Sequence, residues 1–190
     1  MTDSAFEGSE ALDLSRPTGQ IDIATAGDMR AVGQRLGSQL QAGTVVVLTG
    51  PLGAGKTTLT QGLAAGIGVK GRVQSPTFTI VRVHQPGQPG SPGMLHMDAY
   101  RLLGQDVSEG IEPGMHIDRN VVLDALESLD IDATIDTDVV VAEWGRGVVE
   151  MLSDSVLDVE IMRAELAEPD ALEEEPVEPR TLRWTWRRQA

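Results

Sequence analysis

The chain has 190 residues, a formal net charge of −14, 41% hydrophobic residues and no cysteine. This length is sufficient for one domain with a buried core. The charge argues against direct, unaided binding to nucleic acid or to an anionic membrane, because both would repel the surface. The absence of cysteine excludes disulfides, thiolate metal sites and a cysteine nucleophile.

Residues 1–19 are predicted to form a flexible N-terminal tail, and residues 20–190 a single domain. The first residues are polar and acidic, unlike a secretory signal peptide. No apolar run approaches the length that a membrane span requires. We therefore expect a cytoplasmic protein that does not contact a membrane.

The domain is expected to begin with a strand and a helix. Ile21 and Ile23 alternate with polar residues, which predicts a short strand. Thr25 and Asp28 match a capping box and predict the start of a helix. The apolar face of this helix is predicted to contain Met29, Val32, Leu36 and Leu40.

Residues 50–57 read GPLGAGKT and match the phosphate-binding loop pattern G-x-x-x-x-G-K-[ST]. The apolar β-branched residues 45–48 predict a buried strand before this loop. Leu59, Leu63, Ala64 and Ile67 recur at helical spacing after it, and Gly68 can end that helix. A phosphate would then lie at a helix N-terminus, where free amides and the helix dipole favour anions.

Each loop residue has an expected role in binding ATP and Mg²⁺. The side chain of Lys56 would reach the β- and γ-phosphates, and the hydroxyl of Thr57 would ligate Mg²⁺. The residues predicted to bind the nucleotide are Gly53, Ala54, Gly55, Lys56, Thr57 and Thr58.

The rest of the chain alternates between strands and loops. The predicted strands are residues 78–83, 94–97, 139–142, 156–161 and 180–186, with the first two forming a hairpin. Short helices are predicted at residues 121–129 and 148–152, and loops at 85–93 and 104–120. Residues 165–179 are acidic and rich in proline, which predicts a mobile insertion at a hairpin tip.

Two carboxylates follow predicted strands, where the side chain of a strand-end residue can reach a metal or a substrate. Glu143 could hold Mg²⁺ directly or through water, or it could be an ordinary charged residue at a strand end. Asp98 could orient or deprotonate an attacking water, or it could cap the next turn.

Several other polar and aromatic residues have weaker signals. His96 is interpreted as a packed or hydrogen-bonded residue, and three histidines without clustered spacing do not predict a zinc site. Thr77 could contact a γ-phosphate or serve only as a turn residue. Trp144 is predicted to pack beside Glu143.

Four motifs together resemble one family. They are GAGKTT at residues 53–58, SPTF at 75–78, H-x-D-x-Y-R-L at 96–102 and Glu143-Trp144. With these motifs in this order along the sequence, the chain resembles the bacterial tRNA threonylcarbamoyladenosine biosynthesis ATPase family, TsaE (YjeE). The resemblance covers about residues 21–161. Where that family has Asp after the first loop glycine, this chain has Pro51.

The resemblance implies an α/β P-loop NTPase fold, with a mainly parallel central sheet flanked by helices and antiparallel hairpin additions. It implies slow hydrolysis of Mg-ATP in support of the TsaD and TsaB proteins, which modify adenosine 37 of tRNA. Contact with tRNA would be indirect, through those partners. By motif, Lys56, Asp98 and Glu143 would be catalytic, and Thr57 and Glu143 would hold Mg²⁺.

Other functions use the same fold and have their own residue patterns. A P-loop small-molecule or nucleotide kinase would carry a lid with several arginines, whereas the middle of the chain has only Arg101 and Arg119. A GTPase would carry an N-K-x-D signature, and none occurs. A nucleotide-sensing module that does not hydrolyse ATP is opposed only by the presence of Asp98 and Glu143.

Overall fold

The computed structural model describes residues 16–76, 80–99, 134–163 and 179–188, together with residues 120, 123, 124, 127 and 128. Its strands are β1 (Thr18–Ile23), β2 (Val45–Thr49), β3 (Val81–His84), β4 (Met94–Asp98), β5 (Val139–Glu143), β6 (Ser155–Arg163) and β7 (Arg180–Arg188). Its helices are α1 (Ala26–Gly37), α2 (Lys56–Ile67) and the single-turn η3 (Glu150–Leu152). No helix in these described ranges is long and apolar enough to cross a membrane.

The described strands form one sheet in the order β1-β7-β6-β2-β5-β4-β3. Strands β6, β2, β5 and β4 are parallel neighbours in its centre. The outer pairs β3–β4, β6–β7 and β1–β7 are antiparallel. The prediction of a parallel centre with antiparallel additions is therefore confirmed, and the additions account for both edges.

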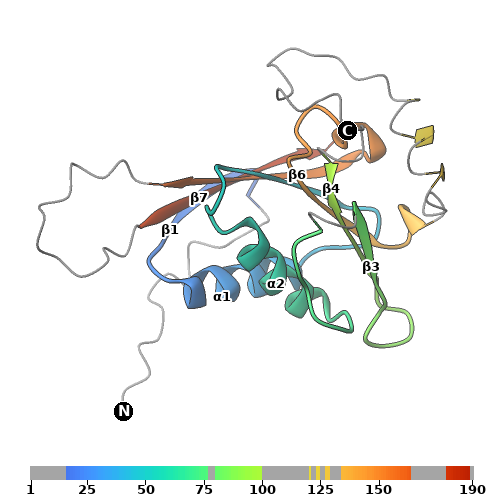
Figure 1. The fold of residues 1–190 in the computed structure, drawn as a ribbon, viewed down its shortest axis with the longest axis horizontal. Coiled ribbons are helices and arrows are strands. Elements are labelled where there is room, and N and C mark those ends of the chain that lie inside the picture. The colour runs from blue at the N-terminus through green and yellow to red at the C-terminus, as the bar shows by residue number, and fades with distance from the viewer. Residues whose placement is uncertain are drawn as a thin grey trace, which may run out of the picture.

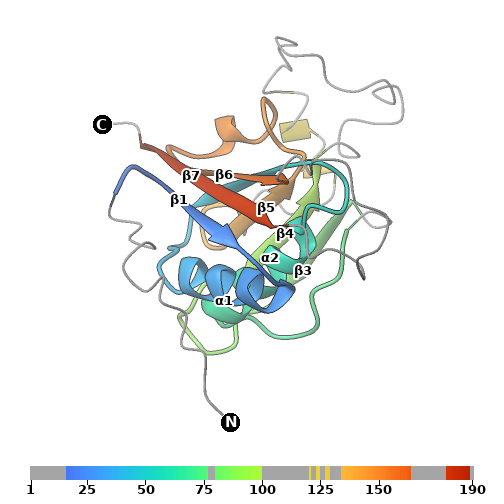
Figure 2. The same cartoon turned by 90° about the vertical axis from the view of Figure 1, so that its left-hand side faces the viewer.

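Both α1 and α2 lie against the same face of the sheet, as Figures 1 and 2 show from two directions. The apolar side chains of this face, including Val46, Leu48 and Trp184, form one core cluster with the two helices. Val45, Val47 and Val140 point to the opposite face, where they pack with residues around η3. The alternation along β2 explains why residues 45–48 read as a continuous apolar run, since both faces of that strand are covered.

The first helix begins as predicted. Thr25 Oγ1 accepts from the Asp28 amide at 3.1 Å, and an Asp28 carboxylate oxygen accepts from the Thr25 amide at 2.9 Å. These reciprocal bonds satisfy two amides that no helical carbonyl can reach. Two boundaries differ from the predictions. Leu40 is buried but lies beyond the end of α1, and β1 begins at Thr18, before the predicted strand residue Ile21.

The predicted hairpin forms between β3 and β4, although β3 begins only at Val81. The helix predicted at residues 148–152 is the shorter η3. Residues 1–15, 77–79, 100–119 and 164–178 lie outside the described part of the chain. So do most residues of the helix predicted at 121–129. The predictions of a tail, of the 104–120 loop and of a mobile acidic insertion are therefore left as predictions.

Helices α1 and α2 cross with their backbones close together, because glycines meet at the crossing point. A Cβ at Gly33 would lie 2.5 Å from the Leu59 carbonyl oxygen and 3.0 Å from the Cα of Gly62. Both distances are shorter than ordinary van der Waals contact. The glycines of this crossing therefore have a packing role that outweighs their low helix propensity.

We expect Gly33→Ala to lower the free energy of unfolding by about 2 kcal/mol, as overpacking at a helix contact does. Urea unfolding would measure this change. Gly27→Ala on the same helix is the matched control, because its Cβ would meet only Thr25 Oγ1 at 3.4 Å. Equal stability of the two variants would contradict the close packing of α1 against α2.

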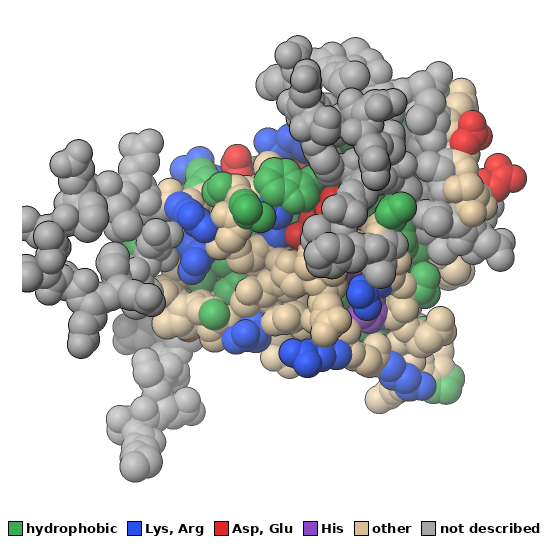
Figure 3. All heavy atoms as spheres, in the orientation of Figure 1, with side chains coloured by type: hydrophobic (Ala, Val, Ile, Leu, Met, Phe, Trp, Pro, Cys, Tyr) green, Lys and Arg blue, Asp and Glu red, His purple; other side chains and the backbone are tan. Residues whose placement is uncertain are grey.

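The surface charge is uneven over the described residues. On the face shown in Figure 3, Lys and Arg side chains are spread along the side formed by the two helices. The formal net charge of −14 for the whole chain is therefore not distributed uniformly over this face. A partner that approaches the helices would meet a less acidic surface than the sequence alone suggests.

Candidate functional site

The candidate site lies at the edge of the sheet where the four parallel strands end. The loop of residues 50–55 follows β2, Glu143 ends β5 and Asp98 ends β4. Because β2, β5 and β4 are parallel neighbours, these groups meet at one edge. Ligands of α/β sheets bind at this carboxyl edge.

The loop leads directly into α2 and leaves the first amides of that helix without side-chain partners. The N-cap is Gly55, which makes no side-chain hydrogen bond, and the first turn contains no acidic residue. Gly53 (φ 74°) and Gly55 (φ 109°) adopt backbone conformations that favour glycine. The Ala54 amide donates to the Pro51 carbonyl at 3.1 Å and closes a turn within the loop. The predicted phosphate site would require such a helix N-terminus.

Lys56 is folded over this loop. Its side-chain Nζ donates to the carbonyl of Gly50 at 2.7 Å and to that of Pro51 at 3.0 Å. The same Nζ lies 3.9 Å from the centroid of the Trp144 ring. Burial lowers the pKa of Lys56 below its ordinary value of 10.5, and the nearby carboxylates of Glu143 and Asp98 oppose this lowering. The cation is thus held at the position where the loop would receive phosphate.

Glu143 connects the loop to the neighbouring strands. Thr57 Oγ1 donates to Glu143 Oε1 at 3.0 Å, and His96 Nε2 lies 3.0 Å from the same oxygen. His96 is fully buried, so this contact restrains the Glu143 carboxylate from the interior of the protein. The interpretation of His96 as a hydrogen-bonded residue is consistent with this contact, although its partner was not foreseen.

The Thr57–Glu143 pair has the donor chemistry of a magnesium site. Hydroxyl and carboxylate oxygens are the ligands that Mg²⁺ prefers, and neighbouring ligands of an octahedral Mg²⁺ lie about 3.0 Å apart when each bond is about 2.1 Å. The observed separation of 3.0 Å between Thr57 Oγ1 and Glu143 Oε1 fits this spacing. No group of three His, Cys, Asp or Glu side chains within the described residues could hold a metal. Water or phosphate oxygens would have to complete the shell.

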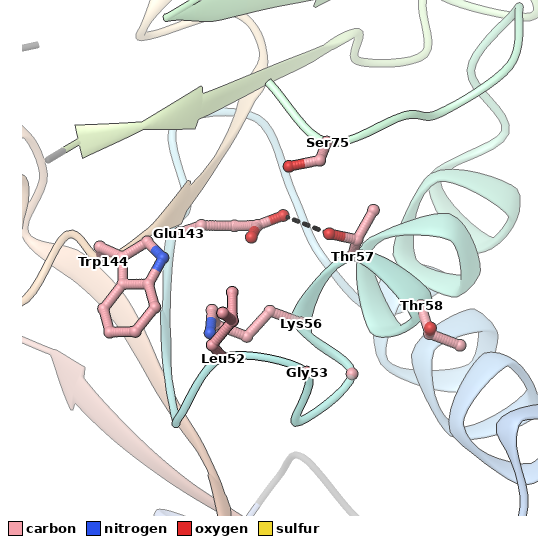
Figure 4. A pocket seen from close by; sticks show the side chains of 9 residues that line it. Leu52, Gly53, Lys56, Thr57, Thr58, Ser75, Glu143 and Trp144 are labelled. Atoms are coloured by element: carbon pink, nitrogen blue, oxygen red, sulfur yellow. Dashed lines mark hydrogen bonds between the residues drawn. The ribbon is translucent and has the colours of Figure 1, made fainter. Parts of the chain in front are cut away.

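A cleft of about 250 Å³ lies between the loop and the end of β5. Figure 4 shows Glu143 and Thr57 joined across it, with Trp144, Leu52 and Lys56 to one side and Ser75 above. The residues that line the cleft are Leu52, Gly53, Gly55, Lys56, Thr57, Thr58, Ser75, Glu143 and Trp144. All the loop residues predicted to bind nucleotide are among them except Ala54, which is buried.

The other predicted site residues have different positions. Asp98 does not line the cleft, but its Cα is the direct partner of Glu143 Cα in the neighbouring strand. Trp144 was predicted to pack beside Glu143, and the two residues line the same cleft. Its ring lies over Lys56, and 40% of the residue is exposed. Thr77 lies outside the described residues.

One residue of the site was missed by the sequence reasoning. Arg163 at the end of β6 donates from Nη2 to the Leu52 carbonyl at 2.9 Å. Nothing in the local sequence distinguishes this arginine from others at strand ends. Only the pairing of β6 with β2 places it beside the loop.

Comparisons with known proteins point to one family. The family model described as "Threonylcarbamoyl adenosine biosynthesis protein TsaE" matches residues 23–170. The chain is 40% identical to the tRNA threonylcarbamoyladenosine biosynthesis protein TsaE of Mycobacterium tuberculosis, covering 90% of this chain and 88% of that protein. It is 46% identical to the protein of the same name from Streptomyces coelicolor, covering 72% and 80% of the two chains.

Among solved structures, the chain is similar to the crystal structure of Bacillus subtilis YdiB. The TM-score is 0.57 at 24% sequence identity, covering 90% of this chain and 86% of that one. At this identity the likeness bears on the fold alone. Together with the family match, it confirms the predicted P-loop NTPase fold.

Proposed function

The chain belongs to the TsaE family, and from this premise we propose that it is an Mg-ATP-binding ATPase of tRNA threonylcarbamoyladenosine biosynthesis. In this proposal it hydrolyses ATP slowly alone and supports the TsaD and TsaB proteins in modifying adenosine 37 of tRNA. The observation that carries the proposal is the 3.0 Å pairing of Thr57 with Glu143 beside the open N-terminus of α2. This arrangement combines an anion site with a metal-binding pair.

The proposed chemistry assigns one task to each group of the site. The amides at the start of α2 bind the phosphates, and Lys56 neutralises charge on the β- and γ-phosphates. Thr57 and Glu143 hold Mg²⁺, which, when bound, neutralises the charge that develops on the transferred phosphoryl group. Asp98 orients the attacking water or accepts its proton.

The charge of the chain favours an indirect role toward RNA. With a formal net charge of −14, an unaided complex with the polyanionic tRNA would be repelled. A protein assembly that itself holds the tRNA removes this difficulty. By the family resemblance, the proposed partners are TsaD and TsaB, and the proposed compartment is the cytoplasm, where ATP and tRNA occur.

The test is to measure release of inorganic phosphate from ATP with the purified chain, with and without added TsaD and TsaB. We expect a slow rate alone and a higher rate with both partners. Transfer of the γ-phosphate to a metabolite would instead indicate a kinase. Tight binding of ATP without hydrolysis in either condition would indicate a nucleotide-sensing module.

A further inference from the structure

Arg163 lies beside the phosphate-binding loop because β6 extends past the end of β2. Thr49, the last residue of β2, pairs with Glu160, so the last three residues of β6 run alongside the loop. A Cβ at Gly50 would lie 2.5 Å from the Ile161 carbonyl oxygen, which shows how closely the loop approaches β6. Arg163 Nη2 then reaches the Leu52 carbonyl at 2.9 Å.

This hydrogen bond fixes the orientation of one peptide unit in the loop. In a planar trans peptide, the carbonyl of Leu52 and the amide N–H of Gly53 point in opposite directions. Arg163 holds the carbonyl toward β6, so the Gly53 N–H points toward the opposite side. Gly53 itself lines the cleft that Glu143 also lines.

The loop needs such a restraint at this point. Gly53 has no side chain and adopts a φ of 74°, so its flanking peptides can rotate at little steric cost. An added Cβ at Gly53 would lie 2.5 Å from Arg163 Nη2, which shows that the guanidinium occupies the space next to this residue. Leu52 itself is 86% exposed and has little packing to restrain it.

We propose that Arg163 is a positioning residue of the phosphate-binding loop, which keeps the Gly53 amide directed at the bound phosphate by holding the Leu52 carbonyl away from it. The inference rests on the proposed function, since it presumes that phosphate binds at this loop. Arg163 acts through the Leu52 carbonyl rather than by contacting the phosphate. Its contribution should therefore depend on a short-range hydrogen bond and should change little with ionic strength.

The experiment is isothermal titration of Mg-ADP into the purified full-length chain and its variants, at low and at high KCl. Arg163→Met keeps the aliphatic stem and removes the donor. Arg163→Lys restores a donor of similar reach. Arg183→Met is the matched control, because it removes another arginine whose Nε donates to Gln20 Oε1 at 3.2 Å on the β1–β7 edge. Thermal unfolding of each variant without nucleotide provides a second readout.

We expect Arg163→Met to raise the Kd for Mg-ADP about tenfold. This factor corresponds to the free energy of one charge-assisted hydrogen bond. The factor should be the same at both salt concentrations, and the unfolding temperature should not change. Arg163→Lys should recover most of the affinity, and Arg183→Met should bind like wild type.

Two results would overturn the inference alone. One is wild-type affinity in Arg163→Met, and the other is a loss that disappears at high salt, which would indicate a direct contact with the phosphate charge. A wild-type chain that binds no Mg-ADP or Mg-ATP would instead overturn the proposed function, and this inference with it.

Discussion

Lys56→Ala is expected to weaken binding of Mg-ATP by roughly 100-fold or more, which corresponds to about 3 kcal/mol. The side chain is only 5% exposed and already directs Nζ at the carbonyls of the loop. A bound triphosphate would be a better partner for this cation than two carbonyl dipoles, because it adds the attraction between full opposite charges to the hydrogen bonds. Titration calorimetry with Mg-ATP and Mg-ADP measures the loss.

The chain contains its own control for this prediction. Its other lysine, Lys70, has an exposed side chain after the end of α2, so Lys70→Ala removes the same charge without touching the loop. The two variants should have similar circular dichroism spectra and unfolding temperatures. Nucleotide affinity that falls equally in both would show that overall charge, rather than the position of Lys56, determines binding.

The features that could be predicted from the sequence are those that depend on residues close together in the chain. The loop at residues 50–57 needs only its own glycines, a strand before it and a helix after it. The capping box of Thr25 and Asp28 likewise joins residues three positions apart. Short-range patterns of this kind are set by local geometry and can therefore be read without knowing the fold.

The parts that could not be predicted depend on the order of strands in the sheet. β1 pairs with β7 although most of the sequence separates the two strands, and no local sequence pattern predicts that pairing. The contact of Arg163 with Leu52 follows from β6 lying next to β2. The contact of His96 with Glu143 follows from β4 lying next to β5. Strand order is a property of the whole topology, so these contacts appear only in the structure.

Trp144 has a contact with Lys56 that the sequence did not predict, for a different reason. The residue has a φ of 62°, which is unusual for a bulky side chain and turns the chain sharply after β5. Its amide nevertheless donates to the Leu48 carbonyl at 3.2 Å, so the turn is anchored to β2. This backbone conformation directs the ring over Lys56. Rare conformations such as this are imposed by tertiary contacts and have no reliable sequence pattern.

Asp98→Asn is expected to leave the Kd for Mg-ADP within about threefold of wild type while lowering the ATPase rate by roughly 100-fold or more, the range of general-base effects. The binding prediction follows from its position. Asp98 does not line the cleft, and its backbone amide is bonded to the Ile80 carbonyl at 2.8 Å, a contact that the substitution preserves.

The rate prediction follows from the pairing of Asp98 with Glu143 across adjacent parallel strands, which places their Cα atoms about 5 Å apart. The charge of Asp98 also acts on Lys56, since it opposes the lowering of the Lys56 pKa. In the proposed site, Asp98 would orient the attacking water without contacting the bound nucleotide. Single-turnover hydrolysis in the presence of the partner proteins separates these roles, with Asp154→Asn at an exposed position as the control. If Asp98→Asn lost binding together with turnover, the carboxylate would be a structural support for the end of β4, and the water would have to be oriented by another group.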